Sequence, residues 1–257
     1  MSAERIRRIP ASFHEKVWGV TDLAPWYPDV RGRIGEVWFE ADLPLLVKFV
    51  LTSERLSVQV HPGDAFAAAH ENSLGKTEMW HVLRAEPGAQ VAIGLREPVS
   101  LEQLRADALS GEIEKRLCWF DASVGDTFFI PAGTIHAIGA GVVLCEVQQH
   151  SNVTYRLYDY GRDRELHVEK ALAVAVREPS DAGRVSLPVS CPYFYTGILE
   201  SGTCHPGTDH FQLLIVLEGT GSIGRNETRA GETWLVPPGS APFEIGAPLK
   251  ILRTQIP

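Results

Sequence analysis

GDTFFIPAGTIH, residues 125–136, recurs near the end of the chain as GETWLVPPGSAP, residues 231–242. Both copies read G-[DE]-T-x3-P-x-G, in which the glycine and the acidic residue suit a turn into a strand and P-x-G suits a second tight turn. A comparable apolar segment precedes each copy, EMWHVL at 78–83 and QLLIVL at 212–217. An internal repeat of this kind predicts two units of related shape.

The segments around the repeat favour an all-β fold. Most are short, rich in Val, Ile, Phe, Trp and Thr, and bounded by Gly, Pro, Asp or Asn, which is typical of a β-sandwich or barrel. Helix is predicted only over 101–117, where Ser100 and Gln103 form a capping box ahead of an apolar stripe, and over 65–71. The helical part should therefore be a small insertion into a β structure.

The two copies of the repeat differ at the positions that carry chemistry. The first copy ends in His136 where the second has Pro242. The apolar segment before the first copy begins with Glu78, where the second has Gln212. Because histidine and glutamate are metal ligands, we expect metal-ligand chemistry in the first unit alone.

The boundary between the two units is predicted in the polar, turn-rich stretch REPSDAGR, residues 177–184. The predicted division is a catalytic domain over residues 1–178, with a helical insertion around 100–117, and a degenerate C-terminal domain over 179–257 without metal ligands.

Composition restricts the partners that the chain can have. The 257 residues are 44% hydrophobic and carry a net charge of -8, with no basic run of the kind that tracks nucleic acid. The start of the chain lacks the apolar stretch of a signal peptide or membrane anchor, so we expect a cytoplasmic protein. The four cysteines are scattered, which favours reduced packing residues.

Strand alternation groups the potential ligands. In LSVQVHP, residues 56–62, Val58 and Val60 should point to one face of a strand, and Gln59 and His61 to the other. The second pair can therefore contribute to one site.

Further ligands come from the strands that follow. Lys76, Glu78 and Trp80 likewise share a face, and His136 follows a tight turn. Together with the two side chains above, Glu78 and His136 would supply two oxygens and two imidazole nitrogens and leave a position for water or substrate. His81 should point away from Glu78, and we interpret it as a packing residue.

These residues resemble a known family. The pattern G-x5-P-x-G-x2-H at 125–136 is the second motif of the cupin superfamily, and QVHP followed by GKTEMW resembles the type I phosphomannose isomerases (mannose-6-phosphate isomerases). The resemblance covers most of the first 170 residues and includes IGEVW at 34–38, PLLVKF at 44–49, PAGTIHAIGAG at 131–141 and EVQQHSNVTYRLYDYGR at 146–162. The length is similar to the short bacterial branch of the family.

The resemblance implies two cupin (jelly-roll) units and an enzyme that interconverts mannose 6-phosphate and fructose 6-phosphate. It implies one Zn²⁺ per chain, although other divalent metals remain open, held by Gln59, His61, Glu78 and His136. It also implies that Lys76, Glu146 and Arg156 line the substrate site.

The reaction assigns hypothetical roles to these residues. Moving a proton between C1 and C2 needs a base, and a Glu146 carboxylate desolvated in a barrel cavity can have its pKa raised towards neutrality. Lys76 and Arg156 would serve the phosphate and the enediolate, and which residue serves which group stays open.

Two alternatives remain at this stage. One is a cupin isomerase for a different sugar phosphate, and the other is a catalytically silent sugar-binding protein that kept the cupin shell. In each case the partner is a small sugar or sugar phosphate, not nucleic acid or membrane, and the protein is a monomer or a homodimer.

Overall fold

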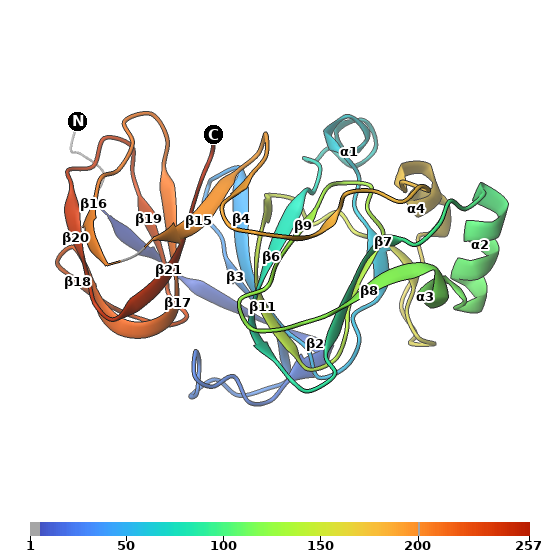
Figure 1. The fold of residues 1–257 in the computed structure, drawn as a ribbon, viewed down its shortest axis with the longest axis horizontal. Helices are drawn as coiled ribbons and strands as arrows, with labels where there is room; N and C mark the ends of the chain where they lie inside the picture. The colour runs from blue at the N-terminus through green and yellow to red at the C-terminus, as the bar shows by residue number, and fades with distance from the viewer. Residues whose placement is uncertain (1–5, 200) are drawn as a thin grey trace.

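The molecule is a stack of β-sheets with helices at one end (Figure 1). The structure is a computed structural model that describes residues 6–199 and 201–257. Over these ranges the chain forms mostly strands together with four helices, which confirms the predicted all-β class with a small helical part. Figure 1 shows the C-terminal strands at one end, the N-terminal strands in the middle and the helices α2 to α4 at the other end.

The N-terminal unit is a sandwich of a seven-stranded and a five-stranded sheet. The strands of the larger sheet, in sheet order, are β13 (Gly183–Val185), β9 (Thr127–Ile130), β6 (Glu78–Ala85), β11 (Val142–Gln149), β4 (Leu45–Leu51), β3 (Ile34–Phe39) and β2 (Ala11–Val20). Those of the smaller sheet are β12 (Tyr155–Tyr158), β5 (Val58–Val60), β10 (His136–Ile138), β7 (Gln90–Leu95) and β8 (Leu117–Asp121). Apolar side chains from both sheets, including Trp80 and Ile138, fill part of the space between them.

Helices cover the outer face of the five-stranded sheet. They are α2 (Leu101–Ser110), α3 (Ile113–Arg116) and α4 (Val168–Val174), while α1 (Asp64–Glu71) follows β5. Leu104 of α2 and Leu172 of α4 belong to the same buried cluster as Val58 and Val60 of β5. Because the two valines face the helices, the alternate residue Gln59 faces the interior of the sandwich.

The predicted single helix over 101–117 is wrong in its extent. Ser100 caps α2 as expected, since its hydroxyl accepts a hydrogen bond from the Gln103 N–H. The helix ends at Gly111, whose φ of 84° is the left-handed conformation that glycine adopts at helix C-termini. A Cβ at Gly111 would lie 2.8 Å from the Tyr158 ring, so the close approach of β12 also requires glycine here. The sequence did not predict α4, whereas the helix predicted over 65–71 is confirmed as α1.

The third sheet forms the C-terminal unit. Its main path, in sheet order, is β1 (Arg7–Ile9), β19 (Thr233–Val236), β17 (Gln212–Ile223), β21 (Leu249–Gln255), β15 (Tyr195–Leu199) and β14 (Val189–Ser190). The remaining strands are β16 (Gly202–Cys204), β18 (Asn226–Arg229) and β20 (Phe243–Gly246), and they pair with each other or with β17. Leu213 and Ile215 of β17 share a buried cluster with Phe49 of β4 and Val147 of β11, so the two units meet through this sheet and the seven-stranded one.

The internal repeat has the same strand register in both units. In the first, Glu78 pairs with Ile130, five residues after the glycine that opens the motif. In the second, Gln212 pairs with Val236, again five residues after that glycine. The repeated sequence therefore builds the same pair of antiparallel strands twice.

Two short strands cross between the predicted domains. β1 comes from the N-terminal segment and pairs with β19 of the C-terminal sheet. β13 lies after residue 178 and pairs with β9 of the first unit. Each predicted domain therefore contributes one strand to a sheet of the other. The division into domains at 1–178 and 179–257 stays a prediction from the sequence.

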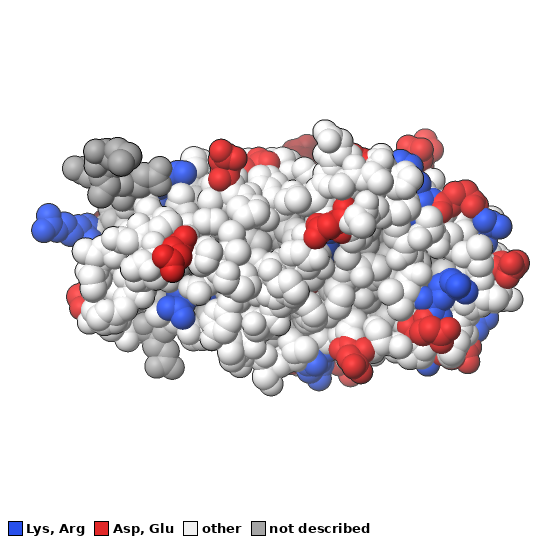
Figure 2. All heavy atoms as spheres, turned by 90° about the horizontal axis from the view of Figure 1, so that it is seen from above, with Lys and Arg blue, Asp and Glu red and all other residues white. Residues whose placement is uncertain are grey.

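Charges are interspersed on the face shown in Figure 2, where basic and acidic side chains alternate at the helical end. Over residues 6–199 and 201–257, the structure contains no helix of the length and apolarity needed to cross a membrane. The four cysteines are unpaired, and Cys145 and Cys204 are buried as packing residues.

Candidate active site

Cross-strand pairing in the five-stranded sheet places three predicted site residues in one row. Arg156 of β12 is the direct partner of Gln59 of β5, and Gln59 is the partner of His136 of β10. Directly paired residues project to the same face of a sheet, so all three side chains face the seven-stranded sheet.

Glu78 reaches this row from the first position of β6 on the opposite sheet. His61 Nε2 lies 3.5 Å from Glu78 Oε2, and His136 Nε2 lies 3.5 Å from Glu78 Oε1. The three side chains are buried, and their ligand atoms all lie within 4.8 Å of one another. The structure thus brings together the two histidines and the glutamate that the sequence predicted as ligands.

Backbone carbonyls fix the orientation of both histidine rings. His61 Nδ1 lies 2.9 Å from the Val153 carbonyl, and His136 Nδ1 lies 2.9 Å from the Thr134 carbonyl. An Nδ1–H donated to a carbonyl leaves the lone pair on Nε2, which lies 3.0 Å from Lys76 Nζ in His61 and 3.2 Å from the Gln59 amide in His136. Burial lowers the pKa of His136 to about 4 and also lowers that of His61, so both rings are neutral near pH 7.

The Glu78 carboxylate carries the strongest indication of a cation site. It is fully buried, and neither of its oxygens has a hydrogen-bond partner in the described residues. Lys76 Nζ lies 2.9 Å from Oε2 as an ion pair, so a single ammonium faces this carboxylate. A buried carboxylate without hydrogen bonds is costly, and a cation bound between it and two imidazole nitrogens removes that cost.

Gln59 lies beside the three ligands. Its amide is 3.2 Å from His136 Nε2, and its Oε1 accepts a hydrogen bond of 3.3 Å from the Ser57 hydroxyl. Because an amide can turn over and the hydroxyl can also accept, Gln59 can present its oxygen to a metal without losing Ser57. The set of two imidazoles, one carboxylate and one amide oxygen fits a divalent metal such as zinc.

A second row of side chains faces the ligands from the seven-stranded sheet. Trp80, Glu146, Lys48 and Trp38 are successive cross-strand partners on β6, β11, β4 and β3. The Trp80 indole N–H donates to Glu146 Oε2 at 3.0 Å, and Lys48 Nζ lies 3.6 Å from Glu146 Oε1. Burial, and then the negative charge of Glu78, raise the pKa of Glu146.

Lys48 is a site residue that the sequence patterns described above do not single out. Its side chain is buried, and its ammonium lies 4.4 Å from the centre of the Trp38 ring. A lysine in the middle of LLVKFVL could have been recognised, because a charge is almost never fully buried without a partner.

Residues of both rows line one cavity of about 330 Å³ between the sheets: Gln59 and Arg156 from the first row, and Trp38, Lys48 and Glu146 from the second. Four of the residues that the sequence singled out line this cavity: Gln59, Lys76, Glu146 and Arg156. The ionisable residues of the lining are Lys16, Lys48, Lys76, Arg156 and Arg164 on the basic side and Glu36 and Glu146 on the acidic side. With five basic and two acidic residues, the cavity favours an anionic ligand.

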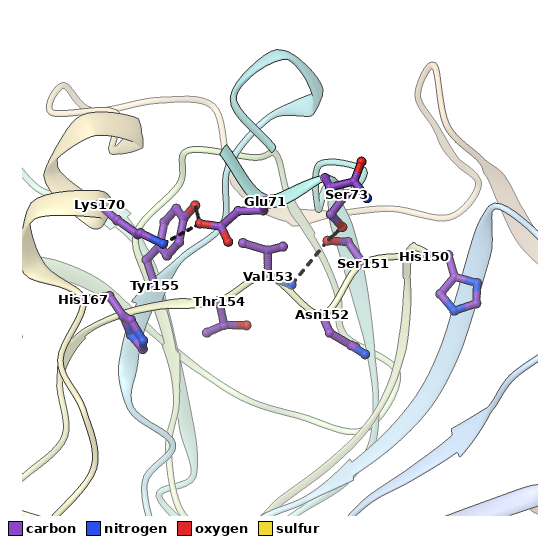
Figure 3. Close-up of a pocket in the computed structure, with 11 residues that line it drawn as sticks. Glu71, Ser73, His150, Ser151, Asn152, Val153, Thr154, Tyr155, His167 and Lys170 are labelled. Carbon is purple, nitrogen blue, oxygen red and sulfur yellow. Dashed lines mark hydrogen bonds and ion pairs between the residues drawn. The ribbon is translucent and has the colours of Figure 1, made fainter. Parts of the chain in front are cut away.

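A second, more open pocket of about 540 Å³ shares a wall with this cavity (Figure 3). Asn152 and Thr154 line both spaces. Figure 3 shows Val153 directed towards Glu71 while Asn152 points the opposite way. Glu71 accepts hydrogen bonds of 2.7 Å from the Tyr155 hydroxyl and from Lys170, which ties α1 to β12 and α4 at the rim.

The fold and this site define the class of the protein: an all-β protein of two sheet-built units, with a buried candidate metal centre beside a cationic cavity in the N-terminal β-sandwich. No protein-family model matches the chain. Mannose-6-phosphate isomerase ManA of Bacillus subtilis (strain 168) is 31% identical over 91% of this chain and 93% of that protein. Mannose-6-phosphate isomerase of Streptococcus mutans is 34% identical over 82% of this chain and 74% of that protein. The chain therefore belongs to the mannose-6-phosphate isomerase family.

Solved structures agree with this fold. The mannose 6-phosphate isomerase of Bacillus subtilis superposes with a TM-score of 0.87 at 24% identity, covering 98% of this chain and 99% of that chain. A putative mannosephosphate isomerase from Archaeoglobus fulgidus superposes with a TM-score of 0.81 at 20% identity, covering 97% and 96%.

Proposed function

We propose that the chain interconverts mannose 6-phosphate and fructose 6-phosphate at the cavity between the two N-terminal sheets. The observation that carries the proposal is that the cavity holds the buried Glu146 carboxylate and an excess of basic side chains, and that two of its lining residues, Gln59 and Lys76, contact the buried His61, Glu78 and His136 cluster. An aldose-ketose isomerase needs a proton carrier, a stabiliser of the enediolate and a phosphate site. The membership in the mannose-6-phosphate isomerase family favours this substrate.

The metal of this proposal is Zn²⁺, held by His61, Glu78, His136 and the Gln59 amide oxygen. When bound, a divalent metal supplies Lewis-acid polarisation of the sugar oxygens at C1 and C2. The Nδ1 hydrogen bonds to backbone carbonyls hold both imidazoles as neutral ligands for it.

Glu146 is the proposed base. It takes the proton from C2 of the aldose and returns it to C1, while the proton of the C2 hydroxyl is transferred to the C1 oxygen. Burial raises the pKa of Glu146, which brings a carboxylate closer to the range where it both accepts and releases a proton. The Trp80 indole N–H donates a hydrogen bond to Glu146 Oε2 and so fixes the orientation of the carboxylate.

Lys76 and Lys48 are the proposed electrostatic partners of the reacting end. Although burial alone would lower it, the pKa of Lys76 is raised by Glu78 and Glu146, so its ammonium stays charged. A fixed ammonium beside the enediolate oxygens stabilises the charge that develops there. Lys48 lies 3.6 Å from Glu146 and lowers its pKa, so this lysine favours the charged form of the base. Arg156, in the row next to Gln59, is the proposed third catalytic-site residue and serves an anionic part of the substrate.

The test is a coupled assay of the purified protein with mannose 6-phosphate, with and without chelator and with zinc added back. The proposal expects turnover that is lost with the metal and restored by zinc. Turnover that survives complete removal of metal would overturn the metal part of the proposal. If metal-loaded protein turns over a different sugar phosphate, the substrate is wrong, and if it only binds sugar phosphates, the chain is a silent binding protein.

We also infer the setting of this activity. The unpaired cysteines Cys118, Cys145, Cys191 and Cys204 support a reducing compartment, and we propose the cytoplasm. The proposed partner is a small sugar phosphate, and the proposed assembly is a monomer or homodimer.

A further inference from the structure

The segment between β12 and α4, residues 159–167, folds back onto Arg156. The His167 backbone N–H donates to the Arg156 carbonyl at 2.7 Å, and the Arg156 backbone N–H donates to His167 Nδ1 at 3.2 Å. The Arg156 guanidinium donates to the Glu165 carbonyl at 2.6 Å. These contacts fix the segment against the edge strand of the sheet that carries Gln59 and His136.

Asp159 is the buried anchor of this segment, with 2% of its side chain exposed. Arg164 forks onto it with two hydrogen bonds of 2.6 Å, from Nε and from one terminal nitrogen. This bidentate geometry fixes the plane of the guanidinium and leaves its other terminal nitrogen free to donate elsewhere. Arg164 lines the cavity.

Arg162 shares the same anchor but has a different environment. It lies 2.8 Å from Asp159, donates to the Arg55 carbonyl at 2.7 Å and stacks near the Tyr160 ring. It is not part of the cavity lining. The two arginines therefore differ in one respect that matters for ligand binding: only Arg164 faces the cavity.

Positive charge exceeds negative charge in this region. Arg162 and Arg164 both pair with one buried carboxylate, Asp159, whose charge also acts on Arg156. The side chain of Glu165 is 82% exposed and lies within ion-pair distance of His167. Burial, and then the charge of Arg164, lower the pKa of Arg156, as expected for two like charges that line one cavity. An anion bound between them would relieve this repulsion.

The guanidinium groups are also separate from the ammonium groups of the cavity. Lys76 contacts His61 and Glu78, and Lys48 contacts Glu146, so both lysines belong to the reacting end. In the described residues, Arg164 forms its ion pair with Asp159, and Arg162 forms ion pairs with Asp159 and Glu54. The cavity thus has two independent cationic groups, and the proposed substrate has two anionic parts, the phosphate and the developing enediolate.

We propose that Arg164, positioned by Asp159, binds the substrate phosphate together with Arg156, and that Lys76 and Lys48 serve the enediolate. This inference rests on the proposed function for the identity of the substrate, but not for the existence of the phosphate site. Guanidinium forks match the oxygens of a phosphate, whereas an ammonium acts as a point charge close to the reacting atoms.

The test measures binding of inorganic phosphate to the whole chain by calorimetry, without any turnover. Arg164→Gln should raise the dissociation constant for phosphate by about tenfold or more, as expected for loss of a charge-assisted hydrogen bond. Arg162→Gln is the matched control, since it removes a neighbouring arginine from the same anchor, and it should keep the affinity of the wild type. Asp159→Asn should weaken phosphate binding because Arg164 is no longer held.

Kinetics then separate phosphate binding from chemistry. For Arg164→Gln, KM for mannose 6-phosphate should rise by about tenfold with kcat reduced far less, and Arg164→Lys should restore part of the loss. Equal weakening of phosphate binding in the Arg162 and Arg164 variants would overturn the inference, because it would mean that the segment merely loses its order. Unchanged phosphate affinity in Arg164→Gln would overturn it as well. A wild type that binds phosphate through Arg164 but does not isomerise mannose 6-phosphate would support the phosphate site and contradict the proposed function.

Discussion

Lys48 Nζ lies 3.6 Å from Glu146 Oε1, and both side chains are buried. The two residues are direct cross-strand partners on β4 and β11, so the strand register itself holds the ammonium against the carboxylate. Burial raises the pKa of Glu146, while Lys76 and Lys48 act in the opposite direction. The pKa of the proposed base is therefore set by a balance between its burial and the charge of Glu78, which raise it, and two lysines, which lower it.

Replacing Lys48 by methionine should disturb that balance. Without this positive charge the pKa of Glu146 rises further, so the acid limb of kcat/KM should move to higher pH and activity at pH 7 should fall by roughly tenfold or more. The measurement is a pH profile of kcat/KM. Lys16→Met is the control, because Lys16 also lines the cavity but pairs with Glu36 at 3.1 Å. An acid limb at the wild-type position in Lys48→Met would contradict this role.

Glu146→Gln should remove the base while leaving the ligands intact. The proposed mechanism expects kcat to fall by about 10²- to 10⁴-fold, because glutamine cannot accept the proton from C2. The amide can still accept the hydrogen bond from Trp80, which limits structural disturbance. Steady-state kinetics together with metal analysis check this outcome. Near-normal turnover with bound metal would show that another residue is the base.

His136→Asn should abolish tight metal binding. A metal that binds only the folded chain stabilises it by about 2.7 kcal/mol when present at a hundred times its dissociation constant. Chelator should therefore lower the melting temperature of the wild type and have little effect on the variant. His81→Asn is the control, since His81 is also a buried histidine of the same unit and bonds to Thr127 instead of facing Glu78. Equal metal content in the His136 variant and the wild type would show that the cluster is not the site.

His81 should make the fold sensitive to acid. Burial lowers its pKa from 6.5 to about 4, and its Nε2 has no hydrogen-bond partner in the described residues. The unfolded chain binds this proton at higher pH than the folded chain, so the contribution of His81 is fully present above pH 6.5 and is lost as the pH falls to about 4.

The loss should reach about 3 kcal/mol, since one pKa unit corresponds to about 1.4 kcal/mol. The measurement is urea unfolding of the wild type and of His81→Asn across pH 4 to 7. The difference between the two free energies of unfolding isolates the contribution of His81, because the other histidines are common to both proteins. A difference between the two free energies of unfolding that does not change with pH would contradict the prediction.

The sequence predicted the parts of the fold that depend on local pattern. Strand alternation separated Val58 from Gln59, and the repeat located the strands at Glu78 and Gln212, whose pairing register proved to be the same in both units. Local pattern failed where a contact from elsewhere decides the outcome. Gly111 ends α2 at a position where β12 packs its Tyr158 ring, and nothing in the residues around 111 reveals that ring.

The sequence by itself determined the all-β class, the repeated pair of strands and the family motifs that carry the proposed ligand residues. Side-chain alternation and turn chemistry are properties of a few neighbouring residues, and a short stretch of sequence is enough to show them. Only the tertiary structure decided that Lys48 lies against Glu146, that Arg164 faces the cavity while Arg162 does not, and that β1 and β13 pair across the predicted boundary. These relationships depend on which strands become neighbours. The pairing of strands follows from the burial of the apolar surface of the whole chain, so no single segment of the sequence reveals it.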